Sequence, residues 1–277
     1  MTFGAETITF TRKQKMRPQS LKARLRRKEL TIGTWLSFGY TQTTEMMARS
    51  GFDWVVVDME HSSTDFSQMR RLIQIIDLCK VPPLVRVGAN DPLLIKKAMD
   101  AGAEGIIVPM VMNVEDARKA IDAIYYAPTG NRGVGLYRAQ DYGRDFSGYR
   151  VRSLAETVFI VQIEHKEAVD QLEHILALEE VDGFIVGPYD MSSSAGVPGE
   201  FEHPTMQSLL ARVHTVASSV EKPGGFHIVQ SDASLLERRV REGYRFLAYG
   251  TEMIFLMEKV AQECNIISGI RKRFRSE

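Results

Sequence analysis

Side chains that can take part in catalysis follow several short apolar runs of the sequence. These candidates are Asp58, His61, Arg86, Gln162, Glu164, Asp190 and His227. Glu164 and Asp190 follow consecutive apolar runs, and two converging carboxylates with open coordination positions suit a hard octahedral ion. They predict a site for Mg²⁺ or Mn²⁺. For either carboxylate alone, a helix cap or a surface ion pair is the alternative role.

The sequence contains no HExxH motif, no zinc-spaced cysteine pair and no EF-hand loop. Mg²⁺ or Mn²⁺ is therefore favoured, although an oxygen-rich site also admits Zn²⁺ or Co²⁺.

Arg86 directly follows the apolar run PPLV, and its planar fork suits a carboxylate or an enolate oxygen. The alternative is an ion pair with Asp58 or Glu60, which would place Arg86 at the same site. Asp58 and His61 form a candidate acid–base dyad, in which the carboxylate orients the imidazole. A capping or merely buried histidine is the alternative.

Four other features favour no competing chemistry. The loop Asn131-Arg-Gly-Val-Gly135 lacks the GxGxxG and Walker spacings, and Ser192 to Ser194 lack a GxSxG elbow, which argues against serine hydrolysis. His165 should point away from Glu164 if the strand continues through both. No lysine stands clearly at the end of a run, which disfavours Schiff-base chemistry.

Eight apolar runs alternate with amphipathic stretches. The predicted strands are 32–36, 54–58, 83–87, 105–109, 159–163, 183–187, 225–229 and 246–250. The predicted helices are 42–50, 65–79, 91–101, 113–125, 166–178, 204–220, 232–242 and 252–265. Continuous apolar strands joined by helices indicate a parallel sheet covered on both faces. Eight such units without a break in composition predict an α/β fold, a single (β/α)₈ TIM barrel.

The barrel is expected to occupy residues 21–277, after a flexible N-terminal arm at 1–20 that shows no periodicity. In this fold catalytic groups lie where strands end, which is where the candidates fall. The longest irregular stretch, about 127–157, is rich in Gly, Arg and Tyr. A loop of this length is usually functional or part of an interface.

Lys plus Arg and Asp plus Glu both number 35, so no overall field favours nucleic acid or an anionic membrane. No apolar run approaches the length needed to span a bilayer. Cys79 and Cys264 are the only cysteines and no secretory segment is evident, so we expect a soluble cytoplasmic protein.

At these candidate residues and around them, the sequence resembles the HpcH/HpaI aldolase family from about Leu30 to Met257. The motifs that carry the resemblance are GFDWVVVDMEH (51–61), LVRVGANDP (84–92), IIVPMV (106–111), YAPTGNRGVG (126–135), VQIEHKEAV (161–169) and VDGFIVGPYDMS (181–192).

The resemblance implies a role for each matching residue. Glu164 and Asp190 would bind the metal, Arg86 the pyruvyl group, and His61 would transfer protons with Asp58. Asp100 matches an aspartate that supports the site of a neighbouring subunit. The family is typically a hexamer, a trimer of dimers, whose C-terminal helix is exchanged between subunits; residues 252–265 match that helix.

The sequence departs from the commoner family pattern at Met59, Tyr189 and Met191, and it looks closer to the macrophomate synthase branch. His227 stands where some aldolases carry an aliphatic residue lining the aldehyde pocket. The substrate-binding residues expected from the motifs and the resemblance are Arg86, Gln162, Gly187, Pro188, Tyr189 and His227. Backbone N–H groups at Gly187 and Pro188 are expected to bind the substrate carboxylate.

The predicted function is a metal-dependent class II pyruvate aldolase, a carbon–carbon lyase that reversibly cleaves a 4-hydroxy-2-oxo acid to pyruvate and an aldehyde. One alternative is an oxaloacetate decarboxylase or a carbon–carbon bond-forming enzyme similar to macrophomate synthase. The other is a non-catalytic metabolite-binding barrel, which would have no need of an acid–base dyad.

Overall fold

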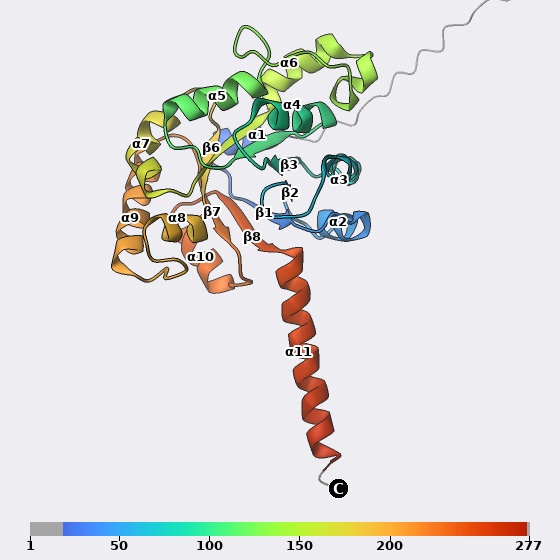
Figure 1. Cartoon of the computed structure of the whole chain (residues 1–277), viewed down its shortest axis with the longest axis vertical. Helices are drawn as coiled ribbons and strands as arrows, with labels where there is room; N and C mark the ends of the chain where they lie inside the picture. Colours follow the sequence, from blue (N-terminus) through green and yellow to red (C-terminus); the bar gives the residue numbers. More distant parts are fainter. Residues whose placement is uncertain (1–18, 276–277) are drawn as a thin grey trace, which may run out of the picture.

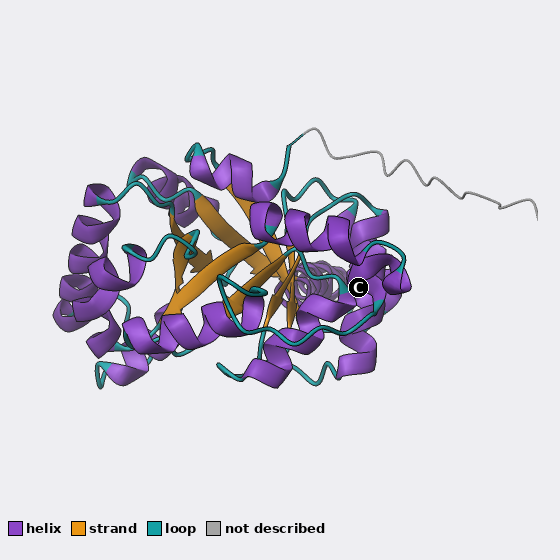
Figure 2. Ribbon diagram, turned by 90° about the horizontal axis from the view of Figure 1, so that it is seen from above, coloured by secondary structure: helices purple, strands orange, loops and turns teal. Residues whose placement is uncertain are grey.

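The computed structural model describes residues 19–275, and within them the strands pair in parallel as a closed barrel in the order β1 to β8 (Figures 1 and 2). The strands are β1 (Thr31–Leu36), β2 (Val55–Asp58), β3 (Pro83–Arg86), β4 (Gly105–Val108), β5 (Val158–Ile163), β6 (Gly183–Val186), β7 (Gly224–Ile228) and β8 (Phe246–Thr251). Figure 2 shows the strands enclosed by helices.

Helices follow the strands along the chain. They are α2 (Thr41–Ala48), α3 (Phe66–Leu78), α4 (Pro92–Ala101), α5 (Val114–Ile124), α7 (Lys166–Leu176), α8 (Pro188–Ser194), α9 (Pro204–Ser219), α10 (Ala233–Arg241) and α11 (Glu252–Arg273). The predicted TIM barrel is confirmed, and every predicted strand lies within one residue of an observed one at each end. No helix within residues 19–275 is long and apolar enough to cross a membrane.

The chain turns sharply from helix to strand after Gly51, Gly102 and Gly243. Their φ angles are +97°, +101° and +95°, a region that side chains with a Cβ rarely adopt. The sequence pattern in which a helix ends in Gly shortly before a strand thus marks left-handed turns that set where β2, β4 and β8 begin.

Strand side chains alternate between two apolar layers. On β5, Phe159, Val161 and Ile163 pack outward against the helices. Val158 and Ile160 belong to the inner cluster that fills the barrel. Because successive strand residues face opposite sides, the register of each strand decides which residue reaches the barrel mouth.

The structure differs from the sequence prediction in three places. The 127–157 stretch is not irregular throughout, since it contains the 3₁₀ helix η1 (Arg138–Gly143) and α6 (Phe146–Glu156). The last helix continues to Arg273 instead of ending near 265 and projects from the barrel as α11 (Figure 1). A further helix, α1 (Leu21–Arg26), precedes β1. Most of the predicted N-terminal arm, residues 1–18, lies outside the described residues.

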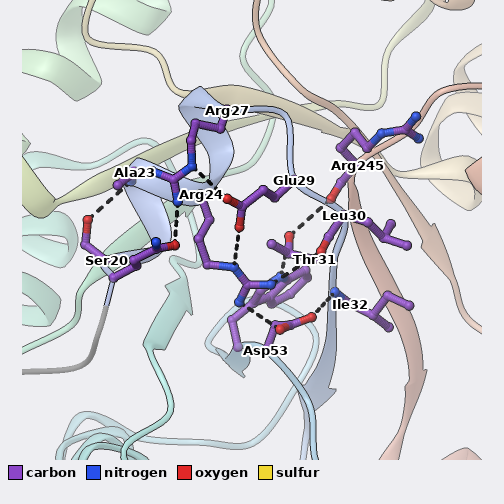
Figure 3. Close-up of polar contacts among 12 residues, drawn as sticks. Ser20, Ala23, Arg24, Arg27, Glu29, Leu30, Thr31, Ile32, Asp53 and Arg245 are labelled. Carbon is purple, nitrogen blue, oxygen red and sulfur yellow. Dashed lines mark hydrogen bonds and ion pairs between the residues drawn. The ribbon is translucent and has the colours of Figure 1, made fainter.

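Helix α1 closes the N-terminal end of the barrel. Its Leu21 and Leu25 join the inner apolar cluster. Arg24 pairs with Asp53 (Nη1 to Oδ1, 2.7 Å), and Asp53 accepts the backbone N–H of Ile32 at 2.8 Å, so α1 is tied to the start of β1 (Figure 3). This end of the barrel is therefore sealed.

Lys22 of α1 is buried at the same end of the barrel. Its Nζ lies 3.0 Å from Asp182 Oδ2 and donates to the carbonyl of Thr157 at 2.8 Å. Burial raises the pKa of Asp182, while the charge of Lys22 lowers it. The Asp182 carboxylate thus depends on Lys22 to remain charged in the interior.

We predict that Lys22→Met destabilises the protein by about 3–5 kcal/mol in urea unfolding, because it leaves the Asp182 carboxylate buried without a counter-charge. Lys28→Met is the matched control: Lys28 pairs with the exposed Glu221, and its loss should cost less than about 1 kcal/mol. Equal losses would show that the buried pair does not hold α1 in place.

Candidate active site

The inner face of β5 changes from apolar to polar toward its carboxyl end. Val158 and Ile160 face the barrel interior, and the two-residue period places Gln162 and Glu164 on the same side above them. Both side chains are buried. The same change occurs on β2, from Val56 to Asp58, and on β3, from Leu84 to Arg86. The strands therefore bring polar groups together at one end of the barrel.

Arg86 and Asp58 form a buried two-pronged ion pair. They are register partners on β3 and β2. Arg86 Nε donates to Asp58 Oδ1 at 3.0 Å and Nη2 donates to Oδ2 at 2.7 Å. Burial lowers the pKa of Arg86, but the bond to Asp58 and the surrounding carboxylates outweigh it and raise the pKa above its ordinary value. The guanidinium is thus charged and fixed in direction.

The third guanidinium nitrogen of Arg86 reaches Glu60, with Nη1 3.2 Å from Oε2. The proposed alternative role of Arg86, an ion pair with Asp58 or Glu60, is therefore observed with both partners, and it does place Arg86 at the site. From the sequence, Glu60 is expected only as such a partner. Its position inside the Asp58–His61 motif was the available signal that it belongs to the cluster.

The predicted side-chain dyad of Asp58 and His61 is not formed in the described structure. Asp58 accepts the backbone N–H groups of Glu60 and His61, at 3.0 and 3.4 Å, and the Arg86 fork takes both of its oxygens. The His61 side chain is 62% exposed, and its Nε2 lies 4.0 Å from Glu60 Oε2. Asp58 therefore shapes the turn that carries His61 instead of orienting the imidazole.

Glu164 is held by two neutral donors. The backbone N–H of Met110 donates to Oε1 at 2.6 Å, and the Gln162 amide donates to Oε2. Met110 has φ +52°, a strained conformation for a residue with a side chain. Burial raises the pKa of Glu164, and the negative charge of Asp190 acts in the same direction. Both donors are neutral, so they orient Glu164 and lower its pKa without balancing its charge, and the positive charge of Arg86 also acts against the effects of burial and Asp190.

Asp190 lies in the first turn of α8, directly after β6. Gly187 caps this helix, and a Cβ there would lie 3.0 Å from Glu164 Oε2 and 3.3 Å from the Gln162 amide nitrogen. Glycine is thus what allows β6 to approach Glu164 so closely. Tyr189 is partly exposed and packs edge-on against Phe201.

The expected carboxylate-binding N–H groups of Gly187 and Pro188 are not available. Gly187 N–H donates to the carbonyl of Ile163 at 3.2 Å, and proline has no N–H. Helix geometry instead leaves the first-turn N–H groups of Tyr189 and Asp190 without an intrahelical acceptor. These two groups can bind an anion at the start of α8.

Negative charge dominates the assembled site. Four carboxylates act electrostatically on one another or on Arg86, and they are Asp58, Glu60, Glu164 and Asp190. Burial raises the pKa of Glu60 to about 7, and the charges of Glu164, Asp58 and Asp190 raise it against the lowering effect of Arg86. Four carboxylates thus face one guanidinium.

No set of three or more His, Cys, Asp or Glu side chains within residues 19–275 is arranged to hold a metal ion. The donors present still fit a hard divalent cation. Glu164 and Asp190 offer two carboxylates whose mutual repulsion a cation would relieve, and among the described residues neither has an ion-pair partner. Such an ion commonly binds through one or two carboxylates and completes its coordination with water or substrate.

His227 points into the barrel from β7, since its neighbours Phe226 and Ile228 belong to the outer layer. Its ring stacks on Trp35 with a centroid distance of 4.5 Å, and Arg86 Cζ lies 5.5 Å from the Trp35 ring centroid. His227 therefore lies next to Trp35, which in turn contacts Arg86. Trp35 is not among the residues predicted for the site, because an aromatic residue inside an apolar run cannot be told from a core residue by sequence.

Asp100 belongs to a different cluster. It accepts a hydrogen bond from Arg132, whose guanidinium packs against the rings of Tyr126 and Tyr149. Gln140 lies near the same carboxylate at 3.5 Å. The bonds of Asp100 thus go to the segment 126–149 instead of the strand-end residues of its own chain.

Comparison with known proteins identifies the class. Residues 31–258 match the HpcH/HpaI aldolase/citrate lyase family. The chain is 36% identical over 236 residues to the 2-dehydro-3,6-dideoxy-6-sulfogluconate aldolase of Pseudomonas putida, covering 85% of this chain and 91% of that one. It is 35% identical to a 4-hydroxy-2-oxo-heptane-1,7-dioate aldolase of Escherichia coli, covering 86% and 90%.

Solved structures agree. An HpcH/HpaI aldolase/citrate lyase family protein from Burkholderia cenocepacia superposes with a TM-score of 0.85 at 31% identity, covering 90% of this chain and 98% of that one. Macrophomate synthase superposes with a TM-score of 0.81 at 23% identity, covering 92% and 91%, a likeness that concerns the fold. The chain belongs to the HpcH/HpaI aldolase/citrate lyase family and is a carbon–carbon lyase.

We predict that Glu60→Gln stabilises the metal-free protein at alkaline pH. Because the pKa of Glu60 in the fold is about 7 instead of 4.5, ionising it costs stability as pH rises from 4.5 to 7. Above pH 7 the free energy of unfolding of the variant should exceed that of the wild type by up to about 3 kcal/mol, and below pH 4.5 the two should be equal. Urea unfolding with EDTA at pH 4.5 and pH 8.5 measures the difference.

The exposed Glu202 provides the control, since Glu202→Gln should alter stability little at either pH. A gain from Glu60→Gln that is the same at both pH values would contradict the electrostatic explanation.

Proposed function

We propose that this lyase is a divalent-metal-dependent class II pyruvate aldolase, which reversibly cleaves a 4-hydroxy-2-oxo acid to pyruvate and an aldehyde. One observation carries the proposal. Glu164 and Asp190, two carboxylates that form no ion pair among the described residues, lie near the guanidinium of Arg86, whose orientation is fixed by Asp58. Relatives bear the names of pyruvate and 4-hydroxy-2-oxo acid aldolases, which supports this substrate class.

Glu164 and Asp190 would hold Mg²⁺ or Mn²⁺, which supplies electrophilic stabilisation of the negative charge that develops on an enolate. Co²⁺ and Zn²⁺ are alternative ions for the same two oxygen ligands. Gln162 and the backbone of Met110 keep the Glu164 carboxylate in one orientation. The ligand side chain is thereby positioned before a substrate arrives.

Arg86 binds the oxygen end of the pyruvyl group. Its guanidinium is already oriented by Asp58 and Glu60, so little reorganisation is needed when charge develops on the substrate. The N–H groups at the start of α8, from Tyr189 and Asp190, are placed to bind the substrate carboxylate.

His61 transfers the proton between the aldol hydroxyl and solvent. Its exposure suits a group that must exchange protons with water, and Glu60 is the carboxylate closest to its ring. Asp100 is assigned to support the site of a neighbouring subunit, held in place by Arg132. Asp58 acts on the reaction through Arg86 and through the turn that presents His61.

We also propose a homo-oligomer, a hexamer built as a trimer of dimers, in which α11 packs on a neighbouring subunit. The helix projects from its own barrel (Figure 1) and exposes Leu256, Met257, Val260, Ile266, Ile267 and Ile270. Burying these side chains against another copy would remove their apolar area from water. A soluble cytoplasmic location and small-molecule substrates accord with this assembly.

Exchange of the pyruvate methyl protons in D₂O, followed by NMR, tests enolate formation without an aldehyde. We expect exchange with Mg²⁺ or Mn²⁺ and none after EDTA. Glu164→Ala and Asp190→Ala should each reduce the rate by at least about 100-fold, because each removes a metal ligand. Glu167→Ala, an exposed position on α7, is the matched control and should retain the wild-type rate.

Wild-type exchange in either ligand variant would refute the metal assignment. If no exchange occurs but oxaloacetate is consumed, the decarboxylase alternative is correct instead.

Arg86→Lys should retain Mn²⁺ binding, measured by calorimetry, while the KM for pyruvate rises by at least about tenfold. Lysine keeps the positive charge that the buried Asp58 needs but lacks the planar fork that binds two oxygens at once. An unchanged KM would remove Arg86 from pyruvate binding, whereas loss of Mn²⁺ affinity would assign it to the metal site.

A further inference from the structure

Two stacked rings beside the active site each carry a buried nitrogen that has no hydrogen-bond partner among the described residues. They are Nε1 of Trp35 and Nε2 of His227. The ring centroids are 4.5 Å apart, with the planes 22° from parallel. Since buried polar atoms are nearly always bonded, a pair of neighbouring exceptions calls for a ligand.

The barrel is built so that these rings meet. Trp35 is on β1 and His227 on β7, and β8 lies between them. The register places Ala248 beside His227 and Thr251 beside Trp35, with a shift in the β1–β8 pairing next to Trp35. The inner face of β8 carries Ala248, and its small side chain leaves room for the two rings to stack across β8.

The hydrogen bonding of His227 fixes which kind of group its free nitrogen can take. Burial lowers the pKa of His227 to about 3, the charge of Arg86 acts in the same direction, and a bond to the Gly250 backbone opposes them. A backbone bond that favours the protonated ring is one in which the ring donates to the carbonyl. Because Nε2 has no partner, the donor is Nδ1, and Nε2 of the neutral ring is an acceptor.

Trp35 supplies the opposite character, since an indole N–H can only donate. The pair therefore offers one donor and one acceptor with no net charge. A hydroxyl group that reaches both nitrogens would satisfy both, because its oxygen accepts and its hydrogen donates. A carboxylate satisfies only the indole and would face the lone pair of Nε2, and a methyl group satisfies neither.

We propose that Trp35 and His227 form a subsite for a neutral hydroxyl group of the substrate, so that the enzyme selects hydroxylated reactants over their alkyl or acidic counterparts. This inference rests on the proposed aldolase function. The contact of Trp35 with Arg86 places the subsite beside the group assigned to the pyruvyl oxygen. The hydroxyl is therefore carried close to the reacting carbons.

Such a hydroxyl can come from either reactant. A 3-hydroxy-2-oxo acid carries it on the donor, and a 2-hydroxyaldehyde carries it on the acceptor. Two pairs of compounds that differ only by hydroxyl against methyl separate these sources. Hydroxypyruvate is compared with 2-oxobutyrate as donor, and glycolaldehyde with propionaldehyde as acceptor toward pyruvate.

We expect wild-type kcat/KM to favour the hydroxylated member of at least one pair by about tenfold or more, because the methyl analogue leaves buried polar atoms unpaired. His227→Leu removes the acceptor and Trp35→Phe removes the donor while keeping an aromatic ring. Each variant should reduce that preference to within about threefold of unity, and the pair that responds identifies the source.

Trp54→Phe is the matched control for replacing a buried tryptophan. Trp54 lies in the same inner cluster, but its Nε1 already donates to Thr31 Oγ1 at 3.2 Å. This variant should lose stability without changing the preference for a hydroxyl. Folding of every variant is checked by its unfolding transition, and kcat/KM ratios are compared within one variant.

Equal kcat/KM for both members of both pairs in the wild type would overturn the subsite, as would an unchanged preference in His227→Leu. Pyruvate proton exchange distinguishes a failure of the hydroxyl subsite from a failure of the proposed aldolase function. Exchange without hydroxyl selection refutes the subsite alone, whereas no exchange and no turnover of any of the four compounds refutes the aldolase proposal and the subsite with it.

Discussion

The site depends on one buried cation surrounded by an excess of carboxylates. Arg86 holds Asp58 with two hydrogen bonds and reaches Glu60 with its remaining nitrogen. Glu164 and Asp190 form no ion pair within residues 19–275, and their charges raise the pKa of Glu60. This imbalance is costly for the isolated fold, and it makes the same position favourable for a divalent cation.

The barrel makes that concentration of charge possible. Each strand is apolar where it crosses the interior and becomes polar at its carboxyl end, as on β5 from Ile160 to Glu164. At the opposite end α1 closes the barrel with Leu21 and Leu25 and with the buried pair of Lys22 and Asp182. The N-terminal end of the barrel thus carries stabilising contacts, and the carboxyl ends of the strands carry the polar groups, a division typical of this fold.

Much of the fold was predictable because its signals are local. Apolar runs, helix caps and glycines at helix ends lie within a few residues of the structure they determine, which is why the strand boundaries agree within one residue. The segment 127–157 was harder to predict. Its α6 carries a weak apolar pattern, with Ser153 as its buried residue, so the helix depends on packing more than on its own sequence.

Residue type and the two-residue period fix which strand side chains face inward, so the barrel, its family and the polar residues at the strand ends can all be predicted from sequence alone. How those side chains pair is set only in the folded barrel. Asp58 bonds Arg86 instead of the His61 ring, the N–H of Gly187 is used by Ile163, and Trp35 meets His227 across β8. Such pairings join separate strands, and strand register and ring packing are properties of the closed barrel.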